Sequence, residues 1–170
     1  MVRLSTQRLI LRTPEPDEGF QYATINELWV HSPDHYAETM LKWQKLGALQ
    51  LFLILARKAR DGDLAVPEGE VIGFLQIAPA DRNVVSYRIH HTLAQEGYMK
   101  EACEAAFDHW FKEMPMEFLY VEARTYNIAV MLMMEEFGLS AEVLRLEGPD
   151  ASWTFGWTSW KFRGTRNTLL

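Results

Sequence analysis

The sequence of 170 residues contains a single cysteine, Cys103, and no apolar run long enough to cross a bilayer. One cysteine excludes an intramolecular disulfide and a metal cluster held by several thiolates. The opening stretch, Met1 to Gln7, lacks the apolar segment of a secretory signal peptide. We therefore expect a cytoplasmic protein with no membrane partner.

Positive charge is also in short supply, since 17 Lys and Arg stand against 23 Asp and Glu, which gives a net charge of −6. Proteins that bind nucleic-acid phosphates usually carry a basic stripe, so we expect no nucleic-acid partner. No repeat, low-complexity tract or linker interrupts the chain. With 48% hydrophobic residues, it can bury a core of its own, and we predict one domain over residues 1–170.

Hydrophobic periodicity predicts strands and helices in mixed order. The expected strands cover residues 9–11, 49–56, 70–77, 84–90, 117–123 and 152–162. Helices are expected over residues 17–28, 34–46 and 128–137 and in the stretch after Gly97, where Met99, Cys103, Ala106 and Trp110 recur at helical spacing. Consecutive strands in the middle of the chain favour an α+β fold, with a mixed, mostly antiparallel sheet of about six or seven strands and helices on both faces.

The most informative stretch runs from the strand at 84–90, through a turn containing Gly97, into a helix. The unpaired N–H groups of a first helical turn point outward and add to the positive end of the helix dipole, so such a turn can bind an anion. A plain connection between a strand and a helix would show the same pattern.

Three blocks of residues carry a family resemblance. Tyr87, Gly97, Tyr98, Glu101 and Ala102 coincide with a tyrosine-bearing strand followed by Gln-Gly-x-Gly-Tyr-Ala-Thr-Glu-Ala; residues 127–139 resemble Asn-x-x-Ser-x-x-x-x-Glu-Lys-x-Gly-Phe; residues 4–12 resemble Leu-x-Thr-x-Arg-Leu-x-Leu-Arg. The blocks occur in the order and spacing of GNAT acetyltransferases, and the opening block is similar to the branch that acetylates ribosomal-protein N-termini.

The resemblance implies an acetyl-CoA-dependent N-acetyltransferase that transfers acetyl directly to an amine. In such enzymes the pantetheine arm pairs with the backbone of the strand that here ends at Ile89–His91. The pyrophosphate sits on the N–H groups of the following loop and turn, here Gln95, Glu96, Gly97, Tyr98, Met99 and Lys100. The asparagine at position 127 contacts the cofactor arm in the family, and it is also a suitable N-cap for the helix that follows.

Three positions depart from the family pattern. Gln95 replaces a glycine, Val130 replaces a serine near the thioester, and Val84 stands where a glutamate base is common. Acetyl transfer needs a neutral amine, and at about pH 7.4 roughly 30% of an α-amine is neutral against about 0.1% of a lysine. The absent carboxylate therefore favours a protein N-terminus as acceptor, followed by a small-molecule amine.

His90 is the candidate replacement base, because it shares the strand face of Val84 and imidazole titrates near neutrality. The alternative is a surface histidine beside the pantetheine. The spacing of His90, His91 and His109 does not suggest zinc, and no metal site is expected. Two further alternatives stay open at this point: a catalytically silent GNAT domain that binds CoA or a protein partner, and a monomer or a homodimer.

Overall fold

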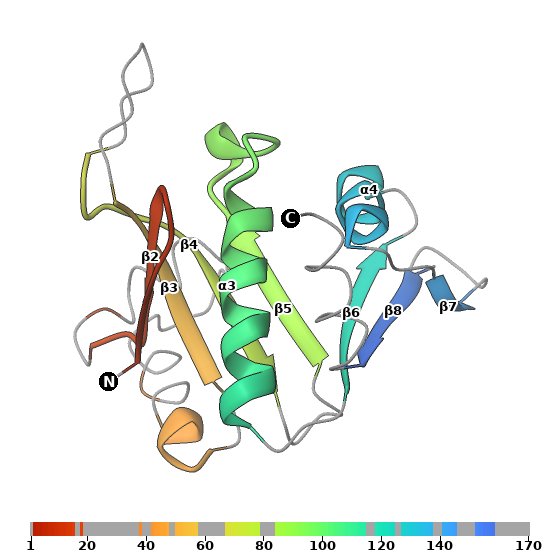
Figure 1. Cartoon of the computed structure of the whole chain (residues 1–170), viewed down its shortest axis with the longest axis horizontal. Coiled ribbons are helices and arrows are strands. Elements are labelled where there is room, and N and C mark those ends of the chain that lie inside the picture. Colours follow the sequence, from red (N-terminus) through yellow and green to blue (C-terminus); the bar gives the residue numbers. More distant parts are fainter. Residues whose placement is uncertain are drawn as a thin grey trace.

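In the computed structural model of the chain, the described residues are 2–15, 18, 38, 42–47, 50–57, 67–78, 84–114, 118–124, 127–137, 141–145 and 152–158. Among them eight strands form one sheet in the order β1-β2-β3-β4-β5-β6-β8-β7 (Figure 1). The strands are β1 (Arg3–Ser5), β2 (Leu9–Arg12), β3 (Gln50–Ala56), β4 (Val71–Ala78), β5 (Val84–Ile89), β6 (Phe118–Arg124), β7 (Ala141–Arg145) and β8 (Ser152–Thr158). The helical elements whose bounds are described are η1 (His91–Leu93), α3 (Tyr98–Glu113) and α4 (Ile128–Glu136).

The sheet confirms the predicted fold class. Every neighbouring pair of strands is antiparallel except β5 and β6, which pair in parallel. The chain between them crosses over through α3, as a parallel connection requires. The GNAT expectation of a mixed, mostly antiparallel α+β sheet is therefore met.

The sheet has more strands than the predicted six or seven, because β1 and β7 were not predicted. Arg3–Ser5 is too short and polar to indicate a strand by itself. It forms one because a tight turn, in which Thr6 N–H donates to Leu9 O at 3.0 Å, pairs Leu4 with Leu11 of β2. Its pairing comes from the hairpin and not from its own composition.

Helix α3 lies across one face of the sheet (Figure 1). Its buried side is made of Ala102, Cys103, Ala106, Phe107, Trp110 and Phe111. The three small side chains let the helix approach the strands closely, and Trp110 stacks on Phe52 with ring centroids 5.8 Å apart. Burial of each large apolar side chain in this core contributes about 1.5–3 kcal/mol.

Side chains are buried on the opposite face of the sheet as well. Because successive residues of a strand point to opposite faces, Phe52 and Ile54 of β3 face α3, whereas Leu51, Leu53 and Leu55 face away. These three leucines form a second buried cluster with Phe74 of β4.

Parts of several predicted elements fall outside the described residues: most of the helices at 17–28 and 34–46, the turn between β3 and β4, and the tail beyond residue 158. Residues 42–45 are helical, and Gly47 follows in left-handed backbone with φ of 70°. No helix among the described residues is long and apolar enough to span a membrane.

Candidate active site

The parallel ladder between β5 and β6 is short. It pairs Val84 with Tyr120 and Val85 with Val121, and it goes no further, although β5 continues to Ile89 and β6 to Arg124. Figure 1 shows the two strands together at their N-terminal ends and apart at their C-terminal ends. The second half of β5 therefore has no ladder partner in β6.

The pairing of β5 with β4 determines which backbone N–H and C=O groups of β5 point toward β6. His90 N–H donates to Ile72 O at 2.8 Å, so alternate residues back along the strand direct their backbone groups to β4. The residues between them, Tyr87 and Ile89, direct theirs toward β6. These groups are placed to hydrogen-bond an extended polar chain, and the contact of Ile89 with the pantetheine arm stays a prediction.

The first turn of α3 presents free donors at the end of this strand. Its N-cap, Gly97, has φ of 79° and makes no capping bond through a side chain. No described residue accepts a hydrogen bond from the backbone N–H of Tyr98, Met99 or Lys100. Free N–H groups at the positive end of a helix dipole fit a diphosphate.

Gln95 stands where the family pattern has a glycine, and its φ is 68°. Among the described residues it is the one with positive φ that is not a glycine. A side chain in the left-handed region costs about 1–2 kcal/mol. A glutamine would replace glycine without strain only at negative φ, so the loop is strained here. Gln95, Glu96 and Gly97 are all exposed, whereas Tyr98, Met99 and Lys100 are half-buried.

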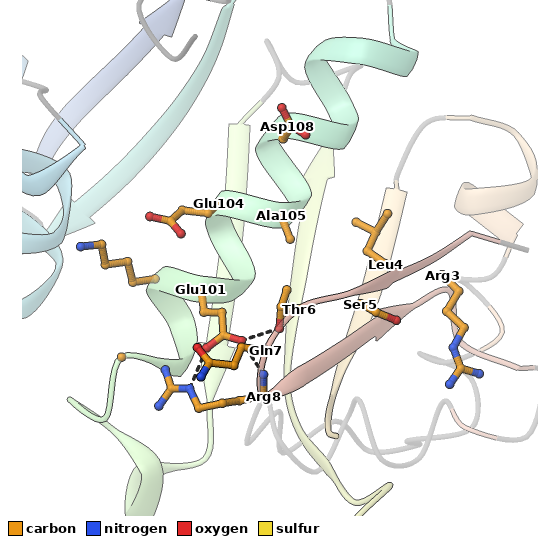
Figure 2. A pocket seen from close by; sticks show the side chains of 12 residues that line it. Arg3, Leu4, Ser5, Thr6, Gln7, Arg8, Glu101, Glu104, Ala105 and Asp108 are labelled. Carbon is orange, nitrogen blue, oxygen red and sulfur yellow. Dashed lines mark hydrogen bonds and ion pairs between the residues drawn. The ribbon is translucent and has the colours of Figure 1, made fainter. Parts of the chain in front are cut away.

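An ion-paired cluster behind the loop joins the start of the chain to α3 (Figure 2). The carboxylate of Glu101 accepts from the Thr6 hydroxyl, from Arg8 N–H at 2.8 Å and from Arg8 Nε at 2.7 Å. Burial alone would raise the pKa of Glu101, but these hydrogen bonds and the guanidinium charge together hold it below its usual range. The same residues border an open pocket between the β1–β2 turn and α3.

Thr6 and Arg8 belong to one block of the sequence and Glu101 to another, and the sequence did not predict a contact between the two blocks. Glu101 is more than ninety residues away from each of its two partners, and no local pattern reports a contact over that distance. The available signal was that these two blocks, which both resemble the family, contain residues of opposite charge, Arg8 in the first and Glu101 in the second.

Asn127 is the N-cap of α4, as predicted. Val130 N–H donates to Asn127 Oδ1 at 3.3 Å, and the Asn127 side chain is exposed. Val130, which stands in place of the family serine, is buried in the core beside Met134 and Phe137. The other end of α4 is tied to the first turn of α3, because Lys100 Nζ lies 2.6 Å from Glu136 Oε2.

His90 and His91 are exposed, and their rings lie tilted against each other with centroids 4.5 Å apart. His90 Nδ1 lies 2.8 Å from Thr92 Oγ1. A strand rises about 3.3 Å per residue, which places His90 about 13 Å along the chain from Ser86, where the ladder with β6 has stopped. His90 therefore flanks the outer part of the opening. Among the described residues no cluster of three His, Cys, Asp or Glu side chains could hold a metal ion.

Burial keeps two potentially reactive side chains, Cys103 and Tyr87, in their protonated forms at neutral pH. Cys103 is fully buried, and burial raises the pKa of its thiol, with a further contribution from the Glu104 charge. Burial likewise raises the pKa of the Tyr87 hydroxyl, which has no hydrogen-bond partner among the described residues. Neither group is placed to act as a nucleophile or base at neutral pH.

Comparison with known proteins identifies the family of the chain. Residues 8–140 match the family described as the acetyltransferase (GNAT) domain. No curated protein sequence matches the chain.

Solved structures of similar fold span nearly the whole chain. Mutant forms of the spermidine/spermine N-acetyltransferase SpeG from Vibrio cholerae match with a TM-score of 0.77 at 15% identity, covering 95% of this chain and 99% of that one. Ribosomal-protein-S5-alanine acetyltransferase from Vibrio fischeri gives 0.74 at 13% identity, with coverage of 93% and 97%. RimJ from Mycobacterium smegmatis, in complex with CoA-disulfide, gives 0.72 at 14% identity, with coverage of 95% and 88%.

An opened pair of parallel strands that leads to a helix N-terminus with free donors, within this matched domain, defines an acyltransferase that uses acetyl-CoA. The chain belongs to the GNAT acetyltransferase family. It is an N-acetyltransferase, and its fold is shared with enzymes that modify ribosomal proteins.

Proposed function

We propose that this acetyltransferase acts on the α-amine of a protein or peptide N-terminus, with small-molecule amines as the second class of acceptor. The observation that carries the proposal is that β5, Val84–Ile89, borders the opening without a single carboxylate. An α-amine with a pKa of about 7.8 is already partly neutral near physiological pH, whereas a lysine with a pKa of about 10.4 is not. The difference amounts to about 3.5 kcal/mol that a base would have to supply.

When bound, acetyl-CoA supplies a thioester whose carbonyl carbon is open to attack by a neutral amine, with cleavage of the carbon–sulfur bond. The residues of the chain act by binding and orientation. Backbone groups of Tyr87 and Ile89 hold the pantetheine arm, and the N–H groups of the first turn of α3 hold the diphosphate. Holding two reactants in register can by itself supply several kcal/mol of the barrier reduction.

Transfer is direct in this proposal, because the chain's only cysteine, Cys103, is sealed in the core. The proton of the attacking amine passes to water or to His90, the candidate base at the outer part of the opening. The net charge of −6 attracts a cationic acceptor at long range. Enzymes of similar fold include both acceptor classes, a ribosomal-protein-alanine acetyltransferase and a spermidine/spermine acetyltransferase.

Two matched peptides test the proposal, one with a free α-amine and no lysine, the other with a blocked N-terminus and one lysine. Release of free thiol from acetyl-CoA measures transfer. The free α-amine should react between about ten and 300 times faster near neutral pH, the upper value being the ratio of the neutral fractions. Preference for the lysine peptide would overturn the proposal. Binding of CoA without transfer to either peptide or to polyamines would favour a silent CoA-binding module.

A further inference from the structure

We propose that Arg8 is a positioning residue for the diphosphate-binding loop, so that the start of the chain sets the affinity for the cofactor. This inference rests on the proposed placement of acetyl-CoA at residues 95–100. Arg8 follows the turn between β1 and β2 and lies beside the loop, as Figure 2 shows.

The guanidinium of Arg8 contacts three successive residues of the loop. Arg8 Nη1 donates to Glu96 O at 3.0 Å. Its carbon Cζ lies 4.3 Å from the ring centroid of Tyr98, within the range of a cation–π interaction. A β-carbon built on Gly97 would lie 3.4 Å from Arg8 Nη2, so the guanidinium also packs against that glycine.

These contacts fall where the loop most needs support. Glu96 stands between Gln95 and Gly97, which have φ of 68° and 79°. Both are in the left-handed region, and for Gln95 that conformation is unfavourable. The hydrogen bond from Arg8 to Glu96 O holds the peptide that joins Glu96 to Gly97. It therefore helps to fix the direction of the backbone N–H groups at the start of α3.

Glu101 holds Arg8 in place from the other side. Its carboxylate accepts from both the backbone N–H and Nε of Arg8. This carboxylate lies in the first turn of α3, where an unpaired negative charge would repel a diphosphate. The Arg8 guanidinium neutralises this carboxylate, so the ion pair presents no net negative charge to the loop.

Arg8→Gln tests the inference, with Arg12→Gln as the matched control. Arg12 lies on the same hairpin, at the far end of β2, and its guanidinium is held by a two-pronged ion pair with Glu18. Calorimetry measures the Kd of CoA. Kinetics with acetyl-pantetheine, which keeps the thioester and lacks the diphosphate, reports on the rest of the site.

We expect Arg8→Gln to raise the Kd of CoA about tenfold or more, because it removes charge-assisted bonds to the loop. Arg8→Gln should change kcat/KM for acetyl-pantetheine by less than about twofold, because the substitution does not reach the pantetheine groups of β5. Arg12→Gln should leave the Kd of CoA unchanged, because the contacts of Arg8 with the loop stay in place. Arg8→Lys keeps the charge but not the fork that reaches Glu96 and Glu101 together. It should fold and still bind CoA less tightly.

An unchanged Kd in both Arg8 variants, with wild type binding CoA, would overturn the inference and leave the proposed function standing. An equal loss with acetyl-CoA and acetyl-pantetheine would also overturn it, because Arg8 would then support the whole fold and not the loop. Failure of the wild-type protein to bind CoA would remove the proposed function itself and the inference with it.

Discussion

Gln95 and Gly97 hold the same left-handed backbone on either side of Glu96, with φ of 68° and 79°. Glycine adopts this conformation freely, whereas glutamine does so at a cost. One of the two positions is therefore matched to its backbone and the other is not.

Gln95→Gly should stabilise the protein. Relief of about 1–2 kcal/mol of backbone strain outweighs the added entropy of the unfolded chain, about 0.4–1 kcal/mol. The expected net gain is about 0.5–1 kcal/mol, read as a higher urea midpoint at unchanged slope. Gln95→Ala is the control, because alanine carries the same φ penalty and should show no gain. A lower midpoint for Gln95→Gly would contradict the strain.

Asn127→Ala should lose about 1 kcal/mol of stability, because the Val130 N–H loses its acceptor at the start of α4. It should also weaken CoA binding if Asn127 contacts the cofactor arm. Asn127→Ser separates the two roles, since serine can cap the helix but has no amide. Normal stability with reduced CoA affinity in Asn127→Ser is the expected pattern. Wild-type affinity in both variants would confine Asn127 to capping.

Cys103 should resist thiol reagents in the folded protein, because it is fully buried and burial raises the pKa of its thiol. The rate of modification by a disulfide reagent should rise with urea in parallel with the unfolded fraction. Cys103→Ala should retain acetyl transfer, because no acetyl group passes through this sulfur. Rapid labelling without urea, or loss of transfer in a folded Cys103→Ala protein, would be incompatible with direct transfer beside a sealed thiol.

Glu101 predicts a loss of stability in acid. Its pKa is lowered in the folded protein, whereas in the unfolded chain a glutamate has a pKa of about 4.3. As the pH falls below about 5, the unfolded chain takes up the proton first, and the stabilisation is lost through the folded pKa. Glu101→Gln should be less stable near neutral pH and flatter below about pH 5.

Glu104→Gln on the same helix is the control for this acid series, since no ion pair of Glu104 is found among the described residues. Its slope of unfolding free energy against pH should follow wild type. An unchanged acid slope in Glu101→Gln would remove the ion pair with Arg8 from the list of stabilising contacts.

As candidate base, His90 predicts that the profile of kcat/KM against pH reflects a group of the enzyme as well as the amine. His90→Ala should then lose roughly 10²-fold in kcat/KM, and His91→Ala, at the neighbouring ring, should not. A profile that follows only the amine, with a pKa of about 8 for a peptide N-terminus, together with an unaffected His90→Ala, would remove His90 from the mechanism. The acetyltransferase assignment would stand.

The periodicity of hydrophobic residues predicted most of the strands and helices among the described residues. The helical spacing of Cys103, Ala106 and Trp110 placed α3, and all three side chains are buried on its inner face. The short strand β1 was not predicted, because its pairing depends on a turn and a partner strand, and a single leucine between two polar residues does not indicate a strand.

The site was predictable only where a motif is local. Gly97 at the helix N-cap and Asn127 as a side-chain cap both follow from residue type and position. The sign of φ at Gln95 does not, because a backbone angle in a loop is set by contacts that the sequence does not reveal. The link between Arg8 and Glu101 is likewise a property of the packed fold.

That link has a consequence for how the chain is made. Arg8, which supports the loop, leaves the ribosome before its partner Glu101, which follows 93 residues later. Contacts of such long range form late, because closing a long segment of chain costs entropy before the contact repays it. We therefore expect the loop at residues 95–100 to be supported only after the central strands have assembled. A nascent chain halted before α3 would contain Arg8 on its hairpin but neither the loop nor Glu101 as a partner.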